Sequence, residues 1–324
     1  MRFGKTFAVL LLLIAPRLHG QAAVTTPAIP GVVAAGTPVL LVNKGLASAE
    51  GPITLADGTV YFTESSHNRI YHLDPGANDK ITLLYDFKKV DDDKGERWRL
   101  SALGMDRKGL IYATRRAGPG HAGIAIVYPP DKARFLAESY QGKPFTGPND
   151  LAIAKNGGIY FSEQGGNAQQ REHSLFYLKP SGELIRIADD IRVPNGVVLS
   201  PDEKTLYAVD TLSDVITAFD LKPDGTVQTR RVFAHFKGMM QTERGPNSGG
   251  DGMAVDSKGR VYAASHAGVE VFSPKGEALG IIPVPEKAVN FTFAGKDRKT
   301  LYILGHGPVY KVQTLAQGYK GRAK

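Results

Sequence analysis

A turn followed by a short strand with a tyrosine occurs six times along this chain of 324 residues, and no other feature constrains the fold as strongly. The turns are rich in Gly, Asp and Lys, and the strands are apolar around the tyrosine. The six tyrosines are Tyr61, Tyr112, Tyr160, Tyr207, Tyr262 and Tyr302. They are separated by 51, 48, 47, 55 and 40 residues, which is close to the length of a four-stranded propeller blade. The repeat therefore predicts an all-β chain folded as a six-bladed β-propeller.

The composition agrees with many short strands and limits the chemistry that the chain can perform. Hydrophobic residues make up 42% of the sequence, enough for a large core, and 37 Gly and 20 Pro supply frequent turns. The absence of cysteine excludes disulfides, thiolate nucleophiles and cysteine-bound metals, so any metal ligands would be oxygen or imidazole. Lys and Arg form no clustered stripe with interleaved aromatic residues, and we expect no nucleic-acid partner.

The first residues have the layout of a secretory signal. Two positive charges precede an apolar run from Thr6 to Ala15, and small residues follow it. The run is too short to span a bilayer. We therefore expect a signal peptide at residues 1–23, a periplasmic or secreted protein, and no stable membrane insertion after cleavage; the alternative is a buried N-terminal helix. Residues 24–38 are interpreted as a linker, 39–316 as the propeller, expected to be a monomer, and 317–324 as a basic tail.

Polar side chains stand at equivalent positions before each repeat tyrosine. Counting back eleven residues, or twelve where the turn is one residue longer, gives Glu50, Ser101, Asn149, Asn195, Asp251 and Asn290. In a propeller, this is where each innermost strand begins at the axis. Converging carboxylate and amide oxygens suit one divalent cation, Ca²⁺ above all, with Zn²⁺ or Mg²⁺ as alternatives. The competing interpretation is that these side chains only cap strand starts through hydrogen bonds to the backbone.

Four short segments give the chain a resemblance to a known family. They are Glu50-Gly51-Pro52, Pro148-Asn149-Asp150-Leu151, Pro194-Asn195-Gly196-Val197 and Asp251-Gly252-Met253-Ala254-Val255-Asp256. In order and spacing they resemble the signature segments of the SMP-30/gluconolactonase/regucalcin-like family, and the similarity runs from about Glu50 to Val312. The resemblance implies a six-bladed propeller with a central divalent metal and, in the enzymes of the family, hydrolysis of lactones.

The resemblance also implies roles for individual residues. Glu50, Asn195 and Asp251 match metal ligands, and Asp251 also matches the base. Asn149 matches an asparagine beside the metal that either ligates it or contacts the substrate, so the implied ligand set is Glu50, Asn149, Asn195 and Asp251. One position departs from the pattern: sugar-lactone hydrolases of the family often have Arg two residues before this asparagine, where this chain has Gly147.

A mechanism follows from the oxygen-rich ring. A cation would polarise an ester carbonyl, and Asp251 or Glu50 would remove a proton from the attacking water. We therefore expect an exported, metal-dependent hydrolase that opens a small lactone. The alternatives are a non-catalytic propeller that binds a partner and is stabilised by the metal, and a paraoxonase-like arylesterase.

Loop residues supply the remaining candidates. His266 and His306 both lie four residues after a repeat tyrosine, in connections expected on the metal face, and are candidates for substrate binding. Histidines in surface loops are also common without such a role. Arg115 and Arg116 could bind an acidic group of the substrate at the rim, although paired arginines in a long loop are more often simply solvated.

Overall fold

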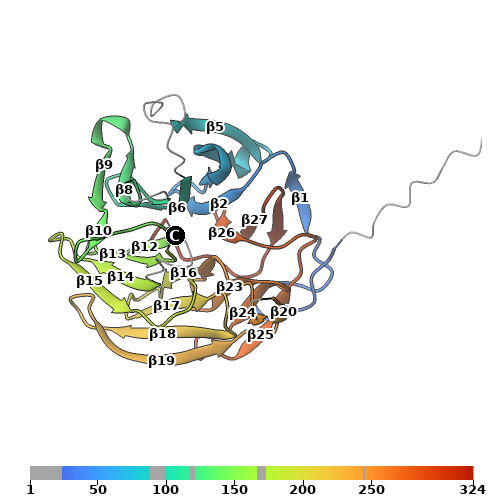
Figure 1. Ribbon diagram of the computed structural model, residues 1–324. Coiled ribbons are helices and arrows are strands. Elements are labelled where there is room, and N and C mark those ends of the chain that lie inside the picture. The colour runs from blue at the N-terminus through green and yellow to red at the C-terminus, as the bar shows by residue number, and fades with distance from the viewer. Residues whose placement is uncertain (1–23, 88–98, 117–120, 166–172, 244, 324) are drawn as a thin grey trace, which may run out of the picture.

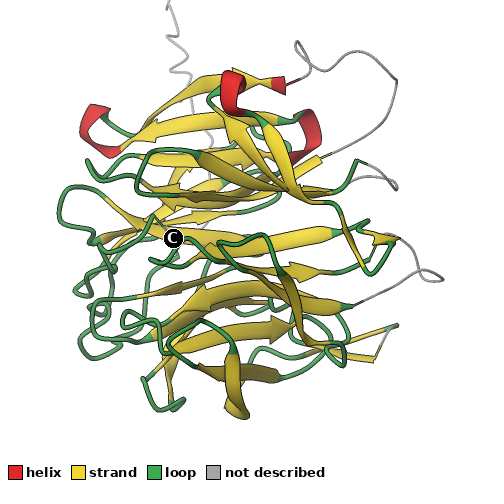
Figure 2. Ribbon diagram, turned by 90° about the vertical axis from the view of Figure 1, so that its left-hand side faces the viewer, coloured by secondary structure: helices red, strands yellow, loops and turns green. Residues whose placement is uncertain are grey.

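The structure, a computed structural model, describes residues 24–87, 99–116, 121–165, 173–243 and 245–323. Six four-stranded antiparallel sheets surround a central axis as the blades of a propeller (Figure 1). Within these described ranges, the helical elements beside the strands are short turns (Figure 2). The predicted all-β six-bladed propeller is confirmed, whereas the predicted signal peptide lies outside the described residues. No helix in the described segments has the length and hydropathy needed to cross a membrane.

Each blade runs outward from its innermost strand. Blade 1 comprises β2 (Ala49–Thr54), β3 (Val60–Glu64), β4 (Arg69–Asp74) and β5 (Lys80–Asp86). Blade 2 comprises β6 (Arg99–Met105), β7 (Ile111–Arg116), β8 (Gly123–Tyr128) and β9 (Arg134–Ala137). Blade 3 comprises β12 (Pro148–Ile153), β13 (Ile159–Glu163), β14 (Ser174–Leu178) and β15 (Leu184–Ala188).

The other three blades follow the same order. Blade 4 comprises β16 (Pro194–Leu199), β17 (Thr205–Asp210), β18 (Val215–Leu221) and β19 (Val227–His235). Blade 5 comprises β22 (Met253–Val255), β23 (Val261–Ser265), β24 (Gly268–Phe272) and β25 (Ala278–Ile282). Blade 6 comprises β26 (Asn290–Ala294), β27 (Thr300–Leu304), β28 (Val309–Gln313) and β1 (Leu40–Asn43).

Smaller elements lie in the connections. Two hairpins precede blades 3 and 5: β10 (Ser139–Tyr140) with β11 (Lys143–Pro144), and β20 (Met240–Thr242) with β21 (Gly245–Asn247). The described residues include the 3₁₀ turns η1 (Ser65–His67), η2 (Pro75–Ala77) and η4 (Pro130–Lys132). Both hairpins belong to connections between blades, on the face where the innermost strands begin.

The ring closes between the two ends of the propeller sequence. β1 pairs antiparallel with β28, with Leu40 opposite Lys311 and Leu41 opposite Tyr310. The last blade therefore takes its outermost strand from the beginning of the chain. This pairing covers the edge of β28, which would otherwise present unpaired backbone groups.

Every repeat tyrosine lies in the second strand of its blade, as the repeat predicts. The turn before it is set by local hydrogen bonds, as in blade 2. There the Asp106 carboxylate accepts the backbone N–H groups of Lys108 and Leu110, each at 2.9 Å, and the Tyr112 hydroxyl at 3.0 Å. Asp is favoured in such turns because its side chain can bond the backbone two residues later. The turn residue and the tyrosine therefore act as one unit.

The hydrophobic core is divided among the interfaces between blades. In one cluster, Ile53 of blade 1 packs with Leu103 and Ile111 of blade 2, and all three side chains are fully buried. Full burial of such a side chain contributes about 1.5–3 kcal/mol. Each blade is covered on both faces, so successive side chains of a strand enter two apolar interfaces in turn. The polar ring residues lie at the strand ends near the axis.

Both flanking segments pack on the propeller. In residues 24–38, Ile29, Val32 and Val33 are buried against blades 5 and 6. Residues 317–323 cross the face opposite the strand starts. There the Ser257 N–H donates to the carbonyl of Gln317 and the Thr54 N–H donates to the carbonyl of Ala323, both at 2.7 Å. Figure 1 places the C-terminal end over the centre of the ring.

Candidate active site

The six polar positions identified from the sequence form a ring around the axis. Glycines allow this close approach. A Cβ on Gly51 would lie 2.4 Å from the carbonyl oxygen of Ser101, and one on Gly196 would lie 2.1 Å from the carbonyl oxygen of Asp251. A Cβ on Gly252 would lie 2.1 Å from the side chain of Asn290. The glycine after Glu50, Asn195 and Asp251 is therefore required by the contact with the next blade.

Threonines of the second strands hold the ring backbone in place. Thr63 donates to the carbonyl of Ser101 at 2.7 Å, and Thr114 donates to the carbonyl of Asn149 at 2.7 Å. Thr114 also accepts the N–H of Ala102 at 2.9 Å. Each of these threonines follows a repeat tyrosine by two residues, so the structural repeat also fixes the start of the innermost strand in the next blade.

Glu50 is held by its neighbours. Its Oε2 accepts the backbone N–H of Gly51 at 2.6 Å and the Asn290 amide at 3.2 Å. The Asn290 oxygen accepts the N–H of Phe291 at 2.9 Å. Asn290 therefore caps the start of its own strand, as the alternative to metal binding predicts, and its oxygen is already used. The contact from Asn290 to Glu50 closes the ring between blades 6 and 1.

Asp251 lies near Glu50, and no Lys, Arg or His side chain among the described residues forms an ion pair with it. Burial, followed by the negative charge of Glu50, raises the pKa of Asp251 well above its usual range, and the charge of Lys287 acts in the opposite direction. In the described part of the chain, no hydrogen bond or ion pair satisfies the Asp251 carboxylate. Two carboxylates thus lie within electrostatic range of each other at the end of the axis where the innermost strands begin.

The two asparagines of blades 3 and 4 complete the set. Asn149 and Asn195 are 8% and 7% exposed. The Asn195 amide donates to the Thr211 hydroxyl at 3.1 Å, which leaves its oxygen for another partner. Among the described residues, the Asn149 side chain has no hydrogen-bond partner. Neither asparagine caps its own strand, in contrast to Asn290.

The donor set matches a hard cation in its chemistry. The described residues contain no group of three or more His, Asp or Glu side chains that could hold a metal. The ring has only two carboxylates, Glu50 and Asp251, so a cation bound there would also need the amide oxygens of Asn149 and Asn195. Ca²⁺ accepts such neutral oxygens and irregular geometry more readily than Zn²⁺ or Mg²⁺ does.

Comparison with known proteins establishes the family. A family model described as the SMP-30/gluconolactonase/LRE-like region matches residues 48–306. The chain belongs to this family. A gluconolactonase from Zymomonas mobilis is 27% identical over an alignment of 309 residues, which covers 90% of this chain and 86% of the relative.

Solved structures of the family share the fold. A gluconolactonase from Xanthomonas campestris superimposes with a TM-score of 0.72 at 27% identity and covers 90% of this chain and 94% of its own. Regucalcin from Agrobacterium tumefaciens, described as a calcium-binding protein, has a TM-score of 0.65 at 18% identity, with 87% and 97% of the two chains covered. The latter likeness shows the shared fold alone.

This family member has no space for the arginine that related enzymes often carry two residues before Asn149. A Cβ on Gly147 would lie 2.6 Å from the carbonyl oxygen of Gly165. The carboxylate of Glu163 accepts the N–H groups of both glycines, at 2.7 and 2.8 Å. The two glycines are therefore held together, and a longer side chain at residue 147 would require the loop to move.

The two predicted histidines lie on the same side of the ring. His266 is half-buried, and its buried Nε2 has no hydrogen-bond partner in the described residues. His306 is exposed. Burial, followed by the charge of Lys287, lowers the pKa of both histidines, so both are mainly neutral at pH 7. The sequence located both on the ring face, and their contact with a substrate stays a prediction.

Sequence reasoning undervalued Arg116. It is the last residue of β7 rather than part of a loop, and it is half-buried. Arg115 turns the other way and stacks on Phe135, with its guanidinium carbon 4.8 Å from the ring centre. The alternation of side chains along a strand could have separated the two arginines.

Asp150 is structural, because its carboxylate accepts the N–H of Val197 at 2.9 Å.

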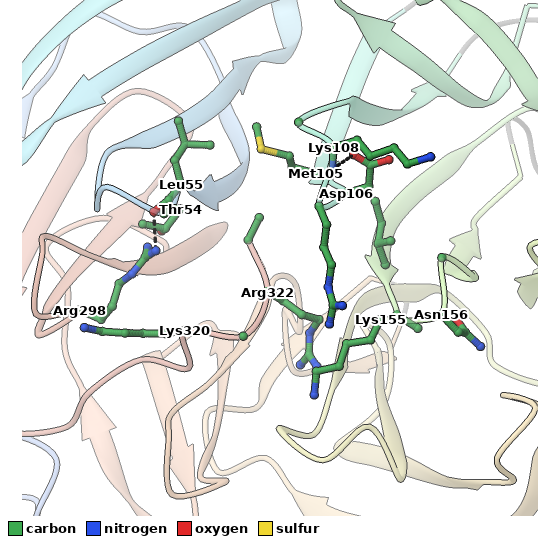
Figure 3. A pocket seen from close by; sticks show the side chains of 18 residues that line it. Thr54, Leu55, Met105, Asp106, Lys108, Lys155, Asn156, Arg298, Lys320 and Arg322 are labelled. Carbon is green, nitrogen blue, oxygen red and sulfur yellow. Dashed lines mark hydrogen bonds between the residues drawn. The ribbon is translucent and has the colours of Figure 1, made fainter.

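The opposite end of the axis is covered by the chain itself. A cavity of about 580 Å³ lies there between the turns of blades 1 to 3 and the C-terminal segment (Figure 3). Arg298 donates to the carbonyl of Leu55, and Arg322 pairs with Glu203 at 3.0 Å. Since the Arg322 side chain is only 6% exposed, it is part of the packing and not a free surface cation. The polar ring lies at the other end of the axis.

Proposed function

We propose that the protein is a metal-dependent lactonase in which Asp251 removes a proton from the attacking water. Membership of the family and similarity to gluconolactonases over nearly the whole chain support lactone hydrolysis. The observation that carries the proposal is the pair of facing carboxylates, Glu50 and Asp251, beside two amides that do not cap their own strands. This arrangement lies at the end of the axis that the C-terminal segment leaves open.

Glu50, Asn149, Asn195 and Asp251 would hold one divalent cation. The all-oxygen donor set favours Ca²⁺. Bound there, the cation would supply Lewis-acid polarisation of the lactone carbonyl.

Asp251 is better suited than Glu50 to act as the base. One oxygen of Glu50 already accepts two hydrogen bonds, from the Gly51 N–H and the Asn290 amide. Asp251 has no such partner in the described residues. It would take a proton from water as the water oxygen bonds to the carbonyl carbon. It would then return the proton to the ring oxygen as the carbon–oxygen bond breaks, giving a hydroxy acid.

The test is acid release, followed by a pH indicator, from sugar, aliphatic and aromatic lactones and from aryl esters. The protein is assayed with Ca²⁺, with Zn²⁺, with Mg²⁺ and with chelator. We expect metal-dependent turnover of a lactone. We also expect Asp251→Asn to lower kcat at least about a hundredfold, since positioned acid–base groups contribute about 10²–10⁴. Asp131→Asn, at an exposed position on blade 2, is the matched control and leaves turnover unchanged.

Three outcomes would contradict the proposal. Full turnover in Asp251→Asn would remove Asp251 from the mechanism. A preference for aryl esters over every lactone would favour the arylesterase alternative. If nothing is hydrolysed with any metal while chelation lowers the Tm, the ion is structural and the protein is a binding propeller.

We propose further that residues 1–23 direct export and that the mature propeller is a periplasmic or secreted monomer. The charged start, the apolar run and the small residues that follow support this assignment. N-terminal sequencing of the protein recovered from cell fractions tests it. A cytoplasmic protein that retains Met1 would contradict it, and light scattering of the mature chain measures the oligomeric state.

A further inference from the structure

Arg116 reaches the polar ring from the interface between blades 2 and 3. Thr114, two residues earlier in β7, donates its hydroxyl to the carbonyl of Asn149 in blade 3. Alternate residues of a strand point to the same side, so Arg116 points into the same interface. Because Arg116 is the last residue of the strand, its side chain lies at the end of the interface where the ring opens.

The guanidinium of Arg116 is surrounded by charges but paired with none. Burial, followed by the charge of Arg99, lowers its pKa, while Glu163, Glu50 and Asp251 act in the opposite direction. All three carboxylates are therefore within electrostatic range. Yet the guanidinium of Arg116 makes no hydrogen bond or ion pair with the residues that the structure describes. A guanidinium offers five N–H donors in a planar fork, which suits a planar oxyanion.

A second cation lies on the other side of the ring. Lys287 precedes Asn290 by three residues, in the connection from blade 5 to blade 6, and is half-buried. Its charge lowers the pKa of Asp251, His266 and His306. Like Arg116, it has no ion pair within the described segments. In a six-membered ring of blades, the interface between blades 5 and 6 is opposite that between blades 2 and 3, so the two cations flank the site.

The charge balance of the site then favours an anion. A divalent cation would be neutralised by the carboxylates of Glu50 and Asp251. The charges of Arg116 and Lys287 would remain, in a partly buried site where electrostatic interactions are weakly screened. Glu163 also acts on Arg116, but burial raises the pKa of Glu163 to about 7, so Glu163 balances this charge only in part. A lactone with a carboxylate or sulfonate group would supply the counter-charge that a neutral lactone lacks.

We propose that Arg116 binds an oxyanion substituent of the lactone, a carboxylate or sulfonate, and makes the enzyme selective for acidic over neutral lactones. The inference rests on the proposed lactonase function. It also gives a reason why residue 147 can be glycine. The positive charge would come from Arg116 of the neighbouring blade instead of from the loop before Asn149. The planar fork suits a carboxylate or sulfonate, with which it can form two parallel hydrogen bonds.

The experiment compares two lactones that differ only in this group, glucono-1,4-lactone and glucaro-1,4-lactone, which has a carboxylate at C6. We expect the metal-loaded parent to have a higher kcat/KM for the acidic lactone. Hydrogen bonds to charged groups predict that Arg116→Met lowers kcat/KM for the acidic lactone about tenfold to a hundredfold, mainly through KM. The neutral lactone should change less than about twofold. Arg116→Lys should retain part of the selectivity, because it keeps the charge and loses the fork.

Two further measurements keep the inference separate from the lactonase proposal. Arg107→Met, which removes an exposed arginine on the opposite face, is the matched control and should leave both lactones unchanged. Calorimetric titration with glucarate and gluconate measures anion binding without turnover, and we expect tighter binding of glucarate that is lost in Arg116→Met. If no lactone is hydrolysed but this difference is present, the lactonase proposal fails and the anion site stands. Equal losses for both lactones, or no preference in the parent, would overturn the role of Arg116.

Discussion

Glu163 gives a quantitative test of the electrostatics beside the ring. Its side chain is almost fully buried at the end of β13, with the residue 2% exposed. One oxygen accepts backbone N–H groups, and the other, Oε2, has no hydrogen-bond partner in the described residues. Burial raises the pKa of Glu163 to about 7, with the N–H groups of Gly147 and Gly165 and the charge of Arg116 acting in the opposite direction.

The sign of the effect on stability follows from the two pKa values. Below pH 4.5, Glu163 is protonated in both the folded and the unfolded chain. Between pH 4.5 and about 7, the unfolded chain releases the proton and the folded chain keeps it, so the free energy of unfolding falls as the pH rises. At about 1.4 kcal/mol per pKa unit, the loss reaches about 3 kcal/mol and then levels off.

The assay compares the parent with Glu163→Gln in denaturant unfolding from pH 4.5 to 8. Glutamine keeps the acceptor oxygen for the two glycines and does not titrate. The amide of the variant introduces buried N–H donors, which lower its stability by an amount that does not change with pH. We therefore expect the stability difference to shift by about 3 kcal/mol in favour of the variant as the pH rises. Glu138→Gln, at an exposed position, should show no such shift.

A difference between parent and variant that does not depend on pH would refute this reasoning. A shift in the opposite direction would refute it more strongly. It would mean that the backbone N–H groups and Arg116 outweigh burial, so that Glu163 is ionised in the folded protein. In that case Arg116 would be partly neutralised by Glu163, and the acidic-lactone inference would lose support.

Two further substitutions test how the ring is held. Thr114→Val removes the acceptor for the N–H of Ala102 and should lower the free energy of unfolding by about 1–3 kcal/mol, measured by denaturant unfolding; an unchanged value would mean that water replaces the hydroxyl. Gly252→Ala places a Cβ 2.1 Å from the side chain of Asn290 and should weaken Ca²⁺ binding in calorimetry, whereas unaltered affinity would mean that the ring adapts without cost.

Much of the architecture could be predicted because one local unit recurs. A turn with an Asp that bonds the backbone and the tyrosine hydroxyl, as at Asp106 and Tyr112, leaves the same signature in sequence wherever it occurs. Strand length is nearly constant in a propeller, so counting back from the tyrosine also located the start of each innermost strand. That is why Asn149 and Asn195 could be assigned to one ring from the sequence alone.

The rest depends on contacts between distant segments, for which a single sequence has no local signal. β1 completes blade 6 because it pairs with β28, which lies at the other end of the propeller sequence. The role of Arg116 depends on β7 extending to that residue and on which interface its side chain enters. The restriction at Gly147 depends on the backbone of Gly165, in a different loop. None of these relations is encoded in residue spacing.

The ring positions that are equivalent in sequence differ in how their polar atoms are satisfied. Asn290 bonds its own strand and Glu50, so its groups are already paired. The Asn149 amide and the Asp251 carboxylate have no such partner in the described residues. These polar groups are therefore left for a ligand that reaches the ring. A ligand that binds these atoms only in the folded protein stabilises that state, which couples occupancy of the ring to stability.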